Sequence, residues 1–130
     1  MENKWKNKSF KNALRNAFNG IKYIYRNERN FRIQVFIAIL ALLIAFFLKL
    51  HLLQIGIIVL VIFLVLLTES INTIIEVVVD MYTEEYNEKA KIAKDVSAGA
   101  VTLISVCSII IGIIIYLPPF INFLRSFLYE

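Results

Sequence analysis

The chain has 130 residues, of which 59% are hydrophobic and 18% are charged, and its formal net charge is +4. A water-soluble domain has about 45–50% apolar and about 25% charged residues. This composition therefore excludes an ordinary soluble fold and a disordered tail, and one cysteine excludes a disulfide scaffold. The apolar residues are concentrated in three blocks. We expect residues 1–130 to form a single membrane-protein domain.

The segment 1–32 is basic and contains nine Lys or Arg residues. Apolar residues recur in it at helical spacing, and cations occupy the other faces. This pattern predicts an amphipathic helix on the membrane surface, with cations at anionic headgroups. A soluble arm that binds nucleic acid is the alternative. The membrane span that follows directly disfavours that alternative, and we expect no nucleic-acid partner. The apolar positions are Phe10, Leu14, Ala17, Phe18, Ile21 and Tyr25.

The three apolar blocks predict three transmembrane helices, at residues 33–50, 52–79 and 96–117. A helix needs about 20 residues to cross the hydrocarbon core of a bilayer, with a range of about 17–25. The second block exceeds this length, so its end should emerge at the membrane interface. After Pro118-Pro119, the aromatic segment 118–130 is predicted to be an interfacial tail.

Positive charge predicts the orientation of these spans. The N-terminal segment carries most of the cations, and the segment 80–95 adds Lys89, Lys91 and Lys94. Cytoplasmic loops collect Lys and Arg. We therefore expect the N-terminus and the segment 80–95 to face the cytoplasm of a bacterial cell membrane and the C-terminus to face outward.

The second predicted span contains polar residues that a membrane helix does not need. At 100° per residue, its polar side chains fall within about 60° of one direction and form one acidic stripe. Glu69 and Asp80 are separated by roughly 16 Å along the helix axis, which places Glu69 inside the membrane if Asp80 marks the surface. Such hard oxygen ligands suit Mg²⁺. The stripe consists of Glu69, Asn72, Thr73, Glu76 and Asp80.

A carboxylate buried in a membrane is costly and indicates a functional site. Two other interpretations remain open: a polar seam that joins helices through Asn72 and Thr73, and a small oligomeric ion or proton transporter. Three carboxylates together disfavour the seam. Against the transporter, the outer half Leu52–Leu67 is almost entirely apolar, whereas a conducting path would need polar residues there too.

Two further charged clusters belong at the same membrane interface. Glu28 and Arg32 are i,i+4 neighbours where the basic segment enters the first span, and Lys91, Lys94 and Asp95 precede the third span. Acidic residues for a metal and cations for phosphates therefore converge on one side of the membrane. The sequence has no GxxxxGK[ST] or GxGxxG loop, so any nucleotide would be held by a different kind of site.

These motifs together resemble the bacterial diacylglycerol kinase / undecaprenol kinase family of small membrane lipid kinases. The resemblance rests on N-E-x-x-F-R from Asn27, on E-x-x-N-T-x-x-E-x-x-x-D from Glu69, and on A-K-D from Ala93. It covers nearly the whole chain. It implies an all-α homotrimeric bundle, with an N-terminal surface helix, three transmembrane helices and active sites composed from adjacent subunits.

The resemblance also implies roles for individual residues. Glu69 would be the general base that takes a proton from the lipid hydroxyl, in a reaction that needs ATP and Mg²⁺. Asn72, Asp80 and Arg32 would position the substrate. Glu28 and Glu76 would bind the Mg²⁺ that accompanies ATP. The implied nucleotide contacts are Glu28, Glu76, Glu85, Tyr86, Asn87, Lys94 and Asp95.

Details of the motifs are more similar to the Gram-positive branch of this family, whose preferred lipid is undecaprenol. Proteobacterial diacylglycerol kinases usually read F-R-x-E and carry Gly-Ser after A-K-D. This sequence has Gln34 at the fourth position of the first motif and Val96-Ser97 after Asp95. The resemblance thus implies phosphorylation of undecaprenol to undecaprenyl phosphate, with diacylglycerol as the alternative acceptor.

Overall fold

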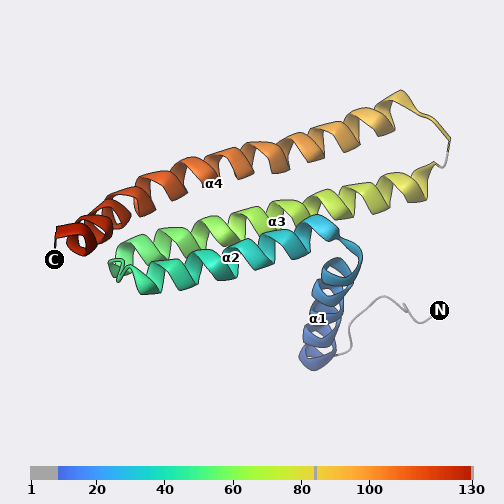
Figure 1. Cartoon of the computed structure of the whole chain (residues 1–130). Coiled ribbons are helices and arrows are strands. Elements are labelled where there is room, and N and C mark those ends of the chain that lie inside the picture. The colour runs from blue at the N-terminus through green and yellow to red at the C-terminus, as the bar shows by residue number, and fades with distance from the viewer. Residues whose placement is uncertain (1–8, 84, 130) are drawn as a thin grey trace.

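Four helices run through the residues that the structure, a computed structural model, describes, namely 9–83 and 85–129. They are α1 (Phe10–Asn27), α2 (Arg29–Phe47), α3 (Leu52–Tyr82) and α4 (Glu88–Tyr129). The last three lie side by side as long rods, with α3 in contact with both α2 and α4, and α1 leaves the start of α2 at a steep angle (Figure 1). No strand occurs among the described residues. The predicted all-α class is confirmed.

Three of these helices are long and apolar enough to cross a membrane, namely those at Arg29–Phe47, Leu52–Tyr82 and Glu88–Ser126. Large hydrophobic side chains on them are exposed; Phe63 is 66% exposed and Leu103 is 74% exposed. Apolar surface of this extent needs lipid or another protein chain around it. The structure thus confirms the prediction of three apolar spans.

The apolar core lies where α2 turns into α3. Ala45, Leu50, Ile58 and Ile115 are buried there and form one cluster. The hydroxyl of Tyr116 donates a hydrogen bond of 2.8 Å to the carbonyl oxygen of Ala41 and so joins α4 to α2. These contacts hold one end of the bundle, whereas the buried residues towards the other end are polar apart from Phe31.

The joint between α1 and α2 is a single residue. Glu28 has an extended backbone (φ −96°, ψ 115°) and forms both the C-cap of α1 and the N-cap of α2. Ser9 caps the start of α1, because its hydroxyl accepts a hydrogen bond from the backbone N–H of Asn12. The first span starts at Arg29, four residues before the predicted boundary, and residues 1–8 of the predicted surface helix lie outside the described residues.

The third span differs from its predicted boundaries at both ends, because α4 runs from Glu88 to Tyr129 as one helix. It begins early because the side chain of Asn87 accepts hydrogen bonds from the backbone N–H groups of Lys89 and Ala90. It also continues through Pro118 and Pro119, although proline cannot donate the helical hydrogen bond. A ring contact between Phe47 and Phe123, with centroids 5.5 Å apart, packs this last part of α4 against the end of α2.

Candidate active site

The candidate active site lies along α3 and extends towards the end of the bundle where α3 leads into α4. Three polar residues are buried in this part of the protein: Glu69, Thr73 and Ser97 are 2%, 4% and 5% exposed. Glu69 and Thr73 belong to the predicted acidic stripe, and Ser97 comes from α4. Buried polar groups in proteins are almost always hydrogen-bonded, so their partners define the site.

Glu69 is held by a residue of α2. The side-chain amide of Gln34 donates a hydrogen bond of 2.8 Å from Nε2 to Oε2 of Glu69. The hydroxyl of Thr73 donates to the carbonyl oxygen of Glu69 one turn back along α3, at 3.2 Å. The buried carboxylate therefore lies between helices and is fixed by an interhelical hydrogen bond.

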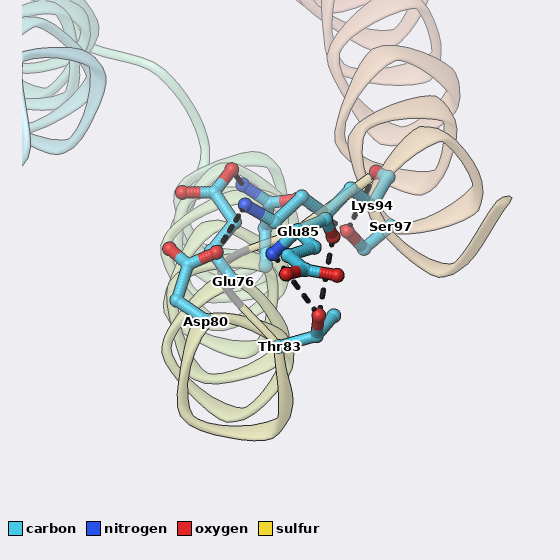
Figure 2. A network of polar contacts seen from close by, with 7 residues as sticks. Glu76, Asp80, Thr83, Glu85, Lys94 and Ser97 are labelled. Carbon is cyan, nitrogen blue, oxygen red and sulfur yellow. Dashed lines mark hydrogen bonds and ion pairs between the residues drawn. The ribbon is translucent and has the colours of Figure 1, made fainter. Parts of the chain in front are cut away.

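Asn72 joins Glu76 to α4. Its Nδ2 donates to Oε1 of Glu76 at 2.9 Å, and its Oδ1 accepts from the hydroxyl of Ser97 at 2.7 Å. The same hydroxyl lies 2.9 Å from the carbonyl oxygen of Lys94, so its single hydrogen is shared between two acceptors. Figure 2 shows Glu76 of α3 and Ser97 and Lys94 of α4 within this network. The network fixes the direction of the Glu76 carboxylate.

We expect Ser97→Ala to lower the free energy of unfolding by about 1–3 kcal/mol, because Asn72 Oδ1 loses a buried donor. Thermal unfolding in detergent measures the change. Ser105→Ala is the matched control, since the Ser105 hydroxyl bonds only to the Val101 carbonyl of its own helix among the contacts described. Equal effects of the two substitutions would contradict the importance of the link between Asn72 and Ser97.

At the solvent-exposed edge of the network, the Lys94 side chain extends from α4 to α3. Its Nζ lies 2.5 Å from Oδ1 of Asp80, and the two side chains are partly exposed. Lys91 and Asp95 form a second ion pair of 2.6 Å within α4. Exposed ion pairs contribute little to stability, about 0–1 kcal/mol. Both pairs can therefore open at small cost when an anionic ligand such as a phosphate arrives.

The loop between α3 and α4 carries three of the residues predicted to contact the nucleotide. The Thr83 hydroxyl accepts from the backbone N–H of Glu85 and donates to its carbonyl oxygen, and Figure 2 shows both residues beside the network. Tyr86 is exposed, and Asn87 caps α4. The contacts described give Asn87 a structural task, and its predicted nucleotide contact stays a prediction.

Two other predicted residues lie at the joint of α1 and α2. Glu28 is half-buried there. The guanidinium of Arg32 donates to the carbonyl oxygens of Tyr25 and Arg26, at 3.2 and 2.8 Å, and so ties α2 to the end of α1. None of these hydrogen bonds joins Arg32 to the acidic stripe. The role of Arg32 in positioning substrate and that of Glu28 in binding metal stay predictions.

The described residues contain no group of three or more His, Cys, Asp or Glu side chains that could hold a metal ion. Proteins usually hold Mg²⁺ with one or two carboxylates, while substrate phosphates and water complete the shell. Glu76 fits that pattern, because its Oε1 accepts from Asn72 and its Oε2 remains as a ligand oxygen.

Two polar residues of the site had no predicted role. Gln34 and Ser97 bond directly to residues of the acidic stripe. Gln34 interrupts an apolar span, and an amide in such a place needs hydrogen-bond partners. That signal could have indicated Gln34. Ser97 gives a weaker signal, because serine in a membrane helix can bond to its own backbone.

Comparison with known proteins identifies the family of this chain. Residues 15–116 match the family model described as prokaryotic diacylglycerol kinase. A relative from Bacillus subtilis named undecaprenol kinase is 39% identical over 112 residues, which cover 86% of this chain and 90% of the relative. A relative from Synechocystis sp. named diacylglycerol kinase is 37% identical over 111 residues, and this match covers 85% of the chain but only 63% of that relative. The predicted resemblance is confirmed, and the chain belongs to the prokaryotic diacylglycerol kinase family of lipid kinases.

Proposed function

We propose that this protein uses ATP and Mg²⁺ to phosphorylate the hydroxyl group of undecaprenol at the cytoplasmic face of a bacterial membrane. The observation that carries the proposal is the burial of Glu69, a carboxylate 2% exposed within an apolar helix of a lipid-kinase chain. A base in this position meets a hydroxyl presented from the bilayer, whereas a soluble sugar would have to enter the membrane.

In the proposed reaction, Glu69 takes the proton of the lipid hydroxyl as the oxygen attacks the γ-phosphorus of ATP, and ADP leaves. Catalysis of phosphoryl transfer consists mainly of positioning and charge neutralisation. Glu76, directed by Asn72, would hold Mg²⁺ together with Glu28, and the ion would neutralise the phosphates when bound. Lys94 would exchange its ion pair with Asp80 for a phosphate oxygen, and Asp95 would contact the nucleotide.

The proposed arrangement in the membrane follows the charges. The cation-rich segments, α1 and the start of α4, would face the cytoplasm, and the C-terminus would face outward. In α1, Phe10 and Phe18 are 83% and 63% exposed, which supports an amphipathic helix on the membrane surface. We further propose a homotrimer with active sites shared between subunits, in which the exposed apolar faces of α2, α3 and α4 are covered.

The choice of undecaprenol rests on the relative from Bacillus subtilis, of which the chain covers 90%. Diacylglycerol is the second candidate, because the relative from Synechocystis is named for it, although the chain covers 63% of that protein. Both lipids present one alcohol group to the same site. The chemistry is therefore shared, and only the lipid differs.

A phosphorylation assay with radiolabelled ATP in mixed micelles tests the proposal, with Mg²⁺ and with each lipid offered separately. We expect strong labelling of undecaprenol and weak labelling of diacylglycerol, and Glu69→Gln serves as the blank. A preference for diacylglycerol would overturn the choice of lipid. If neither lipid shows labelling that is lost in Glu69→Gln, the kinase mechanism itself is overturned.

A further inference from the structure

Gln34 leaves one atom of its side chain without a partner. Its Nε2 donates to Glu69, but its Oε1 is buried and has no hydrogen-bond partner among the described residues. The carboxylate of Glu69 has only acceptor oxygens when ionised, so the amide nitrogen must face it. The amide cannot turn to satisfy Oε1 without losing its bond to Glu69.

Gln34 also lines a pocket between the three spans. The pocket has a volume of about 350 Å³, and its lining is mainly apolar side chains of α2, α3 and α4, with Ser105, Ser108 and Tyr116 as further polar residues. Gln34 and Leu66 belong to the lining, and Glu69 lies one turn beyond Leu66 on α3. The pocket therefore ends beside the hydrogen bond that holds the candidate base.

From these contacts we infer that Gln34 is the positioning residue for Glu69 at this end of the apolar pocket. The inference rests on the proposed lipid-kinase function. The N–H of Gln34 fixes one oxygen of the Glu69 carboxylate, which sets the direction of the other. That second oxygen is the one that would take the proton of the lipid O–H group.

Gln34→Met tests the inference, because methionine keeps the length of the side chain and removes the amide. Removing a hydrogen bond to a charged group is expected to lower kcat roughly ten- to a hundredfold. We expect this loss with undecaprenol as acceptor, while KM for ATP stays within about twofold of the wild-type value. In the Glu69→Gln background, Gln34→Met should cause no further loss, because Gln34 acts through Glu69.

Two further variants separate positioning from folding. Gln34→Asn retains the amide on a shorter side chain and should keep an activity between those of the wild type and Gln34→Met. Gln54→Met removes the same chemical group from α3 near its N-terminus, where Gln54 Oε1 accepts from the backbone N–H of His51, and should leave kcat unchanged. An increase in KM for ATP with Gln34→Met would overturn the inference. It would also be overturned if Gln34→Met lowered kcat by the same factor in the wild-type protein and in Glu69→Gln.

Infrared spectroscopy tests the contact without catalysis. The carboxylate band of Glu69 is the band that disappears in Glu69→Gln, and it should shift in Gln34→Met but not in Gln54→Met. An unshifted band would overturn the inference even if the enzyme phosphorylates lipid. A shifted band in a protein that labels neither lipid would instead retain the contact and overturn the proposed function.

Discussion

Glu69→Gln is expected to reduce kcat for lipid phosphorylation by about two to four orders of magnitude, the usual contribution of a positioned general base. Glutamine has nearly the same shape as glutamate but cannot take the proton. Its side-chain oxygen can still accept the hydrogen bond that Gln34 donates to Glu69, so the helices should remain packed. Steady-state kinetics with saturating ATP and lipid measure the loss.

Glu88→Gln is the matched control, since Glu88 is an exposed glutamate in the first turn of α4. It should retain the wild-type kcat. Thermal unfolding should show that Glu69→Gln is no less stable than the wild-type protein, because a neutral amide replaces a buried charge. A variant at position 69 that stays folded and keeps more than a tenth of the wild-type kcat would contradict the role of general base.

Much of this fold could be predicted from the sequence, because membrane spans need about 20 apolar residues and the three blocks supply them. The ends of the helices were harder to predict. Pro118 and Pro119 indicated the end of a span, yet α4 continues through them, and Phe123 beyond them contacts Phe47 of α2. That contact joins two helices and has no local signal in the sequence.

The acidic stripe was predictable because residues three, four and seven positions apart share one face of a helix. Glu69, Asn72 and Glu76 do lie together on α3, and their hydrogen bonds link them to other helices. Which residues of other helices meet that face depends on how the helices pack. The sequence therefore did not reveal Ser97 as a partner of Asn72, nor Gln34 as the residue that holds the candidate base.

Glu76→Cys is expected to abolish activity with Mg²⁺ and to restore part of it when a softer divalent ion such as Mn²⁺ or Cd²⁺ replaces Mg²⁺. A thiolate is a poor ligand for Mg²⁺ but a good one for softer metals. Glu76 is the residue to test, because Asn72 directs its carboxylate and leaves Oε2 as a ligand oxygen. Titration of kcat with each metal ion measures the change in preference.

The comparison with Glu76→Ala identifies what the thiolate does. Alanine offers no ligand, so this variant should be inactive with all three ions, and neither substitution should prevent folding of the apolar spans. If Glu76→Cys and Glu76→Ala respond equally to the softer ions, Glu76 does not bind the catalytic metal. Its task would then be to hold Asn72 against Ser97, and its loss should lower thermal stability as Ser97→Ala does.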